Sequence, residues 1–249
     1  MKKLNILIVA IVILSSCSNS KQSKVNDDSK MPIKYPQTRI DNSSDEYFGV
    51  KVADPYRWLE DDRSEETAAW VKEENKITQD YLSKIPFRES IAKRYEKIFN
   101  YERFSAPSVH GEYYYYSRNS GLQNQSVIYR EKKAGGTPEI FLDPNTFSKE
   151  GTTSLAGLSF TNDGSLAAYN ISEGGSDWQK IIILNALSKT PIDDTLNEIK
   201  FSGVSWKGND GFFYSTYKKP NEGSLLSGIT DQHYLFYHKI GTKQSEDKL

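Results

Sequence analysis

Two serines stand two positions after a glycine, which is half of the pattern expected around a serine nucleophile. They occur in Gly157-Leu158-Ser159 and Gly203-Val204-Ser205. A nucleophilic serine on a sharp strand-to-helix turn carries the full pattern G-x-S-x-G, and both tripeptides lack the second glycine. We therefore predict that both serines are β-strand residues and that the sequence contains no catalytic residue.

The three histidines could act as general bases or metal ligands, but their surroundings in the sequence favour neither role. His110 precedes a glycine, while His233 and His238 flank an aromatic run. No cysteine or carboxylate stands near them at the spacing of known zinc sites. We predict no metal site and no cofactor.

The acidic run Glu60-Asp61-Asp62 is interpreted as solvated carboxylates near a helix N-terminus, where the helix dipole favours negative charge.

Composition limits the fold and the kinds of partner. The chain has 249 residues, 37% hydrophobic and 26% charged, which is enough for one or two domains with their own cores. Its 32 basic and 33 acidic side chains nearly cancel, which argues against a nucleic-acid partner. The 16 Tyr and 11 Phe lie in short runs that suit strands, so we predict a mainly β protein.

The N-terminus has the features of an export signal. Lys2-Lys3 precedes the apolar run LNILIVAIVIL, which is too short to span a bilayer comfortably, and Ser15-Ser16-Cys17 follows it. This order resembles a bacterial lipoprotein signal, so we predict a signal peptide over 1–17 and a lipid attached to Cys17. An ordinary secretory signal with an incidental cysteine is the alternative. Residues 18–34 are mostly polar and are predicted to be a flexible linker.

Helical signals occupy much of residues 35–100. Asp62 and Glu65 match a capping box, and an apolar stripe that includes Trp70 and Tyr81 follows at helical spacing. Pro86 is predicted to lie in the first turn of a second helix. Ile91, Tyr95, Ile98 and Phe99 are expected to form the buried face of that helix.

From about residue 101 the pattern changes to paired strands that repeat. Strand-like runs flank Gly111, Asp163-Gly164 and Asp210-Gly211, and Asp-Gly between apolar runs indicates a tight turn because glycine tolerates positive φ. Such units recur every ~40–50 residues, which is typical of propeller blades. We predict a partial β-propeller of about three blades over residues 101–249. Three units do not close a ring, so the sequence is expected to be the front part of a longer protein.

Several blocks in this order resemble the N-terminal portion of the prolyl oligopeptidase family, serine peptidases that cut short peptides after proline. The blocks are Tyr35-Pro36, residues 54–61 (DPYRWLED), 64–67 (SEET), Trp70-Val71 and 121–127 (GLQNQSV). The resemblance runs from about residue 35 to the last residue. It implies that the catalytic Ser/Asp/His triad lies in a C-terminal α/β-hydrolase domain that is absent from this sequence.

The resemblance also implies roles for two residues of the propeller. Asp177 matches an aspartate that pairs with a substrate-binding arginine of the catalytic domain, and Phe201 matches a phenylalanine that lines a substrate subsite. The alternatives are a solvated turn aspartate and a core phenylalanine. In this family the propeller caps the catalytic domain and admits only short peptides, and the N-terminal segment packs on the catalytic domain.

Three hypotheses follow for function. The first is an N-terminal fragment of a lipid-anchored, proline-specific serine oligopeptidase, exported to the cell envelope and inactive by itself. Its partners would be short proline-containing peptides, the C-terminal catalytic domain and, through Cys17, a membrane. The second is a lipid-anchored β-repeat module that binds without catalysis, and the third is a degraded reading frame with no function.

Overall fold

The computed structural model describes residues 33–218 and 230–249. The predicted signal peptide 1–17, with Cys17, lies outside the described residues, as does nearly all of the predicted linker 18–34. Both remain predictions. Within the described ranges no helix is long and apolar enough to cross a membrane.

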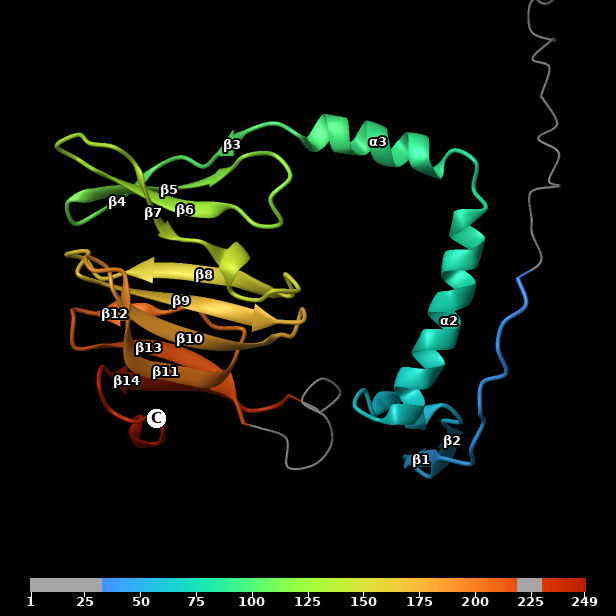
Figure 1. Ribbon diagram of the computed structural model, residues 1–249. Helices are drawn as coiled ribbons and strands as arrows, with labels where there is room; N and C mark the ends of the chain where they lie inside the picture. The colour runs from blue at the N-terminus through green and yellow to red at the C-terminus, as the bar shows by residue number, and fades with distance from the viewer. Residues whose placement is uncertain (1–32, 219–229) are drawn as a thin grey trace, which may run out of the picture. The chain divides into compact units, whose positions relative to one another are not determined.

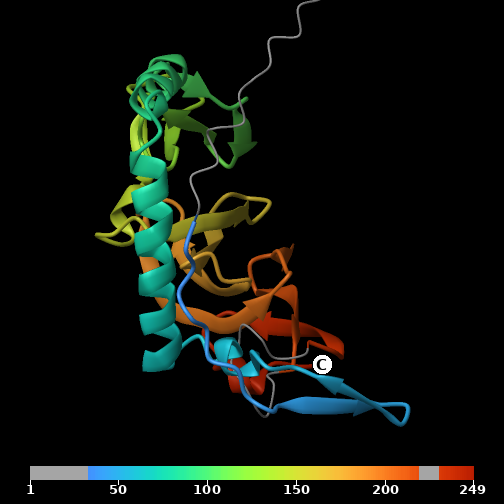
Figure 2. The same ribbon diagram turned by 90° about the vertical axis from the view of Figure 1, so that its right-hand side faces the viewer.

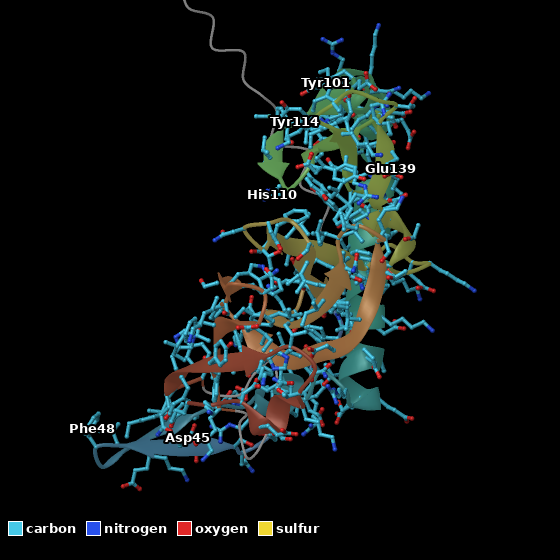
Figure 3. All side chains as sticks on the ribbon, turned by 90° about the vertical axis from the view of Figure 1, so that its left-hand side faces the viewer. Asp45, Phe48, Tyr101, His110, Tyr114 and Glu139 are labelled. Atoms are coloured by element: carbon cyan, nitrogen blue, oxygen red, sulfur yellow. The ribbon has the colours of Figure 1, made fainter. Side chains whose placement is uncertain are left out.

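Among the described residues the first element is a β-hairpin that the sequence did not predict. Its antiparallel strands are β1 (Ser44–Tyr47) and β2 (Val50–Ala53). The two turn residues Phe48 and Gly49 both have positive φ, 51° and 80°, which suits the twist of a two-residue hairpin loop. Figure 2 shows the two strands of the hairpin, and Phe48, labelled in Figure 3, is fully exposed at its tip.

The block DPYRWLED, residues 54–61, contacts this hairpin. It contains the short 3₁₀ helix η2 (Arg57–Glu60). The Arg57 guanidinium donates to Asp54 at 3.0 Å and also to Asp45 of β1. Trp58 donates its indole N–H to the carbonyl oxygen of Arg39 at 3.0 Å. The block therefore ties the hairpin to the chain that precedes it.

The first long helix of the described residues is α2 (Glu65–Ser83), and its N-cap lies two residues after the predicted Asp62. Ser64 is its N-cap, and the Ser64 hydroxyl accepts the backbone N–H of Thr67 at 3.0 Å. The predicted capping box from Asp62 to Glu65 was therefore wrong, because Ser64 satisfies the free N–H group of the first turn instead.

The apolar stripe of α2 is only partly covered within the described chain. Trp70, Ile77 and Tyr81 are half-buried, whereas Val71 is 42% exposed. The Trp70 indole donates to the Thr38 hydroxyl at 3.0 Å, so the extended segment before the hairpin lies against this helix.

The second helix, α3 (Arg88–Phe99), differs from its prediction in two ways. Pro86 precedes the N-cap Phe87 and lies outside the first turn. The face expected to be buried is open, since Ile91 and Tyr95 are 58% and 60% exposed. Tyr95 and Phe99, four residues apart, stack on one another at 4.2 Å between ring centroids.

Three antiparallel sheets follow in chain order (Figure 1). The first, here called blade 1, contains β5 (Tyr113–Asn119), β6 (Val127–Lys132) and β7 (Glu139–Leu142) as successive neighbours. The short strands β3 (Arg103–Phe104) and β4 (Ser108–His110) both pair with β5. The 3₁₀ helix η3 (Pro144–Thr146) leads to the next sheet.

Blade 2 is a four-stranded antiparallel meander. Its strands are β8 (Thr153–Phe160), β9 (Leu166–Glu173), β10 (Trp178–Asn185) and β11 (Thr190–Lys200). The predicted Asp163-Gly164 turn joins the first two strands, with Gly164 at φ 72°. This sheet confirms the strand–turn–strand unit read from the sequence.

Blade 3 has three strands, β12 (Ser205–Lys207), β13 (Gly211–Tyr217) and β14 (His233–Lys239). The predicted turn at Asp210-Gly211 is displaced, because the positive φ of 58° belongs to Gly208. Gly211 lies within β13, where a Cβ atom would collide with the carbonyl oxygen of His238. The 3₁₀ helix η4 (Gln244–Glu246) follows the last strand.

Two hydrophobic cores lie between neighbouring blades. Aromatic side chains of blade 1, including Tyr115 and Phe141, pack with Ala167 and Leu184 of blade 2. On the other side of blade 2, Ile181, Ile183 and Leu196 pack with Phe212 and Tyr214 of blade 3. These contacts confirm the predicted mainly β fold with a partial propeller of about three blades preceded by a helical segment.

Candidate functional site

Asp177 lies in the turn between β9 and β10 and is exposed. Two glycines at positive φ, Gly174 (61°) and Gly175 (76°), reverse the chain there. The Ser176 hydroxyl accepts the Trp178 N–H at 3.1 Å, and Ser176 also presents its carbonyl oxygen to the Ser172 hydroxyl at 2.6 Å. The turn around Asp177 is thus fixed by local hydrogen bonds, while Asp177 itself is exposed.

Phe201 follows the last residue of β11 and is held in an unusual backbone conformation. Its φ is 55°, in the left-handed region, and Glu198 three residues earlier has φ 56°. Left-handed backbone is unfavourable for a bulky side chain and gathers at functional positions. The Phe201 side chain is 60% exposed, so the alternative of a core phenylalanine is excluded.

The strand register of blade 2 places these two residues at the same end of the sheet. Trp178 of β10 lies directly opposite Lys200 of β11, so Asp177 and Phe201 each adjoin a member of one cross-strand pair. The Lys200 ammonium lies 5.1 Å from the Trp178 ring centroid and 5.2 Å from that of Phe201. The stem of Lys200 is buried, so this cation braces both aromatic rings.

Blade 3 extends this aromatic surface. Tyr217, at the end of β13, meets Phe201 edge-on with 6.2 Å between centroids. Tyr217 also stacks on His233, the first residue of β14, at 4.5 Å. Phe201, Tyr217 and His233 together form what we call the aromatic edge, which can bury an apolar side chain of a bound peptide.

The serines singled out from the sequence occupy the positions predicted for them. Ser159 lies in β8 opposite Ala168, and its hydroxyl donates to the carbonyl oxygen of Val204 at 3.3 Å. Ser205 begins β12 opposite Phe213. Neither stands on a strand-to-helix turn, so neither has the backbone geometry of an activated nucleophile.

The histidines occupy three different environments. His110 is the last residue of β4 in blade 1 (Figure 3) and stacks on Phe160 with 4.3 Å between ring centroids, and burial lowers its pKa. His233 belongs to the aromatic edge. His238 is fully buried between the carboxylates of Asp194 and Asp247.

The environment of His238 was missed by the sequence reading, which assigned it no acidic partner. Asp194 lies 44 positions away in the chain, and only the packing of blade 3 on blade 2 brings it to the ring. No sequence spacing marks such a pair. Among the described residues, no group of three His, Cys, Asp or Glu side chains is arranged to hold a metal ion.

Comparisons with known proteins agree with this architecture. Residues 35–249 match the family model described as prolyl oligopeptidase, N-terminal beta-propeller domain. The chain is 56% identical to a prolyl endopeptidase of Elizabethkingia meningoseptica over 247 residues, which is 99% of this chain and 34% of that protein. It is 34% identical to a prolyl endopeptidase of Dictyostelium discoideum, over 85% of this chain and 35% of that protein.

Solved structures give the same result. One, from a structural and mechanistic analysis of two prolyl endopeptidases, matches with a TM-score of 0.74 and 29% identity over 86% of this chain and 32% of its own. Prolyl oligopeptidase B of Galerina marginata, bound to a 35mer substrate, matches with a TM-score of 0.70 and 30% identity over 87% and 34%.

The chain spans about a third of the length of the curated relatives it matches. The match nevertheless covers all three blades and the segment before them. The chain therefore belongs to the prolyl oligopeptidase family, to whose N-terminal propeller region its residues correspond.

Proposed function

We propose that this chain is the N-terminal, substrate-gating part of a serine peptidase that hydrolyses short peptides on the carboxyl side of proline. The observation that carries the proposal is 56% identity to a prolyl endopeptidase across 99% of the chain. The reaction would be acyl transfer from the peptide to a serine and then to water. The serine and its histidine and acidic partners would belong to the part of the relatives that this chain does not cover.

Asp177 is proposed to hold an arginine of the catalytic part. Its carboxylate is exposed on a turn that two glycines and Ser176 keep in place, so it can accept both N–H groups of a guanidinium. An arginine fixed in this way would present its remaining donors to the peptide backbone.

Phe201 is proposed to line an apolar subsite for the peptide. Its exposure, its left-handed backbone and its contacts with Lys200 and Tyr217 keep a bare aromatic ring in one position. A ring held in advance binds an apolar side chain without paying to be ordered first.

The propeller is proposed to limit substrate size by covering the catalytic serine, so that folded or long peptides are excluded. The N-terminal segment is proposed to dock on the catalytic part. The open face of α3 and the exposed aromatic tip of the β1–β2 hairpin support this, because both present apolar side chains that the described residues leave uncovered.

Export and lipid attachment at Cys17 are proposed from the sequence alone. Metabolic labelling with a radioactive fatty acid should label the protein, and Cys17→Ser should abolish the labelling. Label retained by the serine variant would contradict the anchor and leave the ordinary secretory signal.

The proposed reaction is tested with a fluorogenic peptide that carries proline at the scissile bond. The protein expressed from its complete reading frame should hydrolyse the peptide and lose activity to a serine-reactive phosphonate, whereas the 249-residue chain alone should not. If the complete protein is inactive, the non-catalytic binding module becomes the better interpretation. If the 249-residue chain is active by itself, the assignment of the triad to another part is wrong.

The roles of the two propeller residues are tested separately. Phe201→Ala should raise KM for peptides with an apolar side chain at the matching subsite about tenfold, and should change kcat little. Asp177→Asn should reduce kcat/KM for all peptides alike. Leu187→Ala, at an exposed turn at the other end of blade 2, provides the control and should match the unmodified protein.

A further inference from the structure

A buried lysine adjoins both of the candidate site residues. Lys200 is the last residue of β11 and immediately precedes Phe201. It lies directly opposite Trp178, the residue that follows Asp177. Although lysine is seldom buried, Lys200 is only 7% exposed. Its charge is therefore held next to the surface on which a peptide is proposed to bind.

The ammonium of Lys200 contacts two aromatic rings and, among the described residues, pairs with no carboxylate. Its nitrogen lies 5.1 Å from the ring centroid of Trp178 and 5.2 Å from that of Phe201. Arg130, the other buried lysine or arginine of the described chain, pairs with Glu139 at 2.7 Å. Aromatic faces attract a desolvated cation but do not cancel its charge. Lys200 thus keeps a net positive charge beside the Phe201 ring.

The Phe201 ring is open to a peptide and close to this charge. Phe201 is 60% exposed. A peptide side chain packed on the ring, at about 4 Å, lies within roughly 9 Å of the Lys200 nitrogen, which is 5.2 Å from the ring centroid. Charges separated by this distance at a protein surface still interact appreciably, because water does not fill the space between them.

A free aromatic face would itself favour basic side chains, since its negative quadrupole attracts cations. The Lys200 ammonium opposes this attraction at Phe201. Asp177 carries the opposite charge on the neighbouring turn, but the arginine proposed as its partner would neutralise it. Lys180, two residues beyond Trp178, already pairs with Glu173 at 2.7 Å.

We propose that Lys200 sets the specificity of the Phe201 subsite, which accepts apolar and acidic side chains of the peptide and rejects basic ones. This inference rests on the proposed peptidase function, through which the subsite is assigned. The ammonium acts in two ways. It holds the ring in position for apolar contact, and it repels lysine and arginine while attracting aspartate and glutamate. The substrates are then short proline-containing peptides that are apolar or acidic at one position.

The test uses the protein expressed from its complete reading frame and fluorogenic peptides that carry proline at the scissile bond. Residues on the N-terminal side of the proline are varied one at a time. The position at which Phe201→Ala weakens the preference for leucine is the one that contacts the ring. At that position glutamate should exceed lysine in kcat/KM about tenfold, with glutamine between them, and added salt should narrow the difference.

Matched variants isolate the charge of Lys200. Lys200→Met retains most of the buried stem and removes the ammonium, so kcat/KM for the lysine peptide should rise and the ratio of glutamate to lysine should approach one. Lys200→Arg keeps the charge and should keep the ratio. Lys180→Met removes the same charge from an exposed position on β10 and should leave the ratio unchanged.

Peptide affinity, measured by calorimetry, separates this inference from the proposed reaction because binding needs no hydrolysis. Tighter binding of the glutamate peptide without hydrolysis would exclude the reaction and support the role of Lys200. Hydrolysis with equal kcat/KM for the glutamate and lysine peptides would support the reaction and overturn the role of Lys200. Neither binding nor hydrolysis would overturn both.

Two further results would contradict the role of Lys200. One is an equal change of the ratio in Lys200→Met and Lys180→Met, and the other is a Phe201→Ala variant that alters the preference at no position. Should Lys200→Met fail to fold, Lys200→Gln takes its place. The unmodified protein also tests the proposal by itself, since equal treatment of glutamate and lysine overturns it without any variant.

Discussion

Single residues hold neighbouring blades at a fixed distance, and the turn glycines show this most directly. A Cβ atom on Gly164 would lie 2.5 Å from the backbone nitrogen of Gly111, and one on Gly111 would lie 2.7 Å from the Asp163 carbonyl oxygen. The β4–β5 turn of blade 1 therefore touches the β8–β9 turn of blade 2 backbone to backbone. Asp163 continues the series by accepting from Asn209, in the corresponding turn of blade 3, at 2.6 Å.

Replacing a glycine can cost free energy in two ways, through backbone strain at positive φ and through a clash of the new Cβ atom with a neighbouring blade. Gly175→Ala adds a Cβ at positive φ in open space and should cost about 1 kcal/mol of unfolding free energy. Gly164→Ala, at nearly the same φ, must also push blade 1 away and should cost roughly 3 kcal/mol or more. Urea denaturation of both variants measures the difference. Equal losses would show that the blades move apart freely at this turn.

Arg130 performs a related task on the seam between blades 1 and 2. Its side chain is 4% exposed, and its guanidinium pairs with Glu139 at 2.7 Å and donates to the carbonyl oxygens of Ala186 and Leu187 in blade 2. Arg130→Met should cost about 3 kcal/mol, because it leaves buried acceptors without donors.

An exposed ion pair gives the control for Arg130. Lys180 and Glu173 pair at 2.7 Å with side chains that are 41% and 57% exposed. Lys180→Met should change the midpoint of urea denaturation little, since solvent screens such pairs. A comparable loss in both variants would mean that the seam does not depend on the buried guanidinium.

At the residue scale the sequence predicts local geometry better than long-range partners. Ser159 and Ser205 were placed in strands correctly, because a missing second glycine is a local fact. His238 was not understood, because its partner Asp194 arrives from a different blade. Gly211 was read as a turn glycine, although close packing against β14 is what requires its missing side chain.

Among the elements, α3 differs most from its neighbours. Its apolar residues are open, while β9 and β10 are buried on both sides by blades 1 and 3. In the isolated 249-residue chain we expect α3 amides to exchange rapidly and β9 and β10 amides to exchange slowly. Strong protection of α3, or of α2 between Trp70 and Leu82, would show that the segment 35–100 is ordered without a partner.

Element ends were predicted less well than element types, for a physical reason. Both helices were expected, but Asp62 and Ser64 are competing N-cap residues two positions apart, and only the geometry of the preceding turn decides between them. The β1–β2 hairpin was overlooked because its loop is Phe48-Gly49, and phenylalanine seldom adopts positive φ.

Taken as a whole, the blade stack carries uncovered apolar faces at both ends. On blade 1, Phe104 and Tyr114 are 58% and 40% exposed and line a groove of about 370 Å³. Tyr114 is labelled in Figure 3. On blade 3, Phe213 and Leu235 are 37% and 60% exposed. Both end faces carry apolar side chains, as do the faces that are buried between neighbouring blades. Exposed apolar side chains are expected on a blade that has no neighbour to cover it.

These faces predict how the 249-residue chain behaves alone. It should bind an apolar fluorescent dye and self-associate, and Phe104→Thr with Leu235→Ser should reduce both effects without lowering the denaturation midpoint. Leu187→Ser, at an isolated exposed leucine, serves as the control. A monodisperse chain that ignores the dye would show that the end faces are closed in some other way.

The fold of the whole molecule could be predicted because its strand–turn–strand unit repeats along the sequence. Turn glycines recurring near Gly111, Gly164 and Gly211 predicted blades without any knowledge of which side chains touch. What could not be predicted is how one blade meets the next, since the contacts of Arg130, Asp163 and His238 all join residues that no local pattern connects.

The spacing of those contacts has a consequence for how the chain is made. Arg130 contacts Ala186, which lies 56 residues later in the chain, and Asp163 contacts Asn209, which lies 46 residues later. Each blade can therefore form these contacts only after the next blade has left the ribosome. Until β9 and β10 emerge, the aromatic inner face of blade 1 stays uncovered, and the same holds for blade 2 until β13 appears. We expect slow translation over residues 140–200 to prolong that exposure.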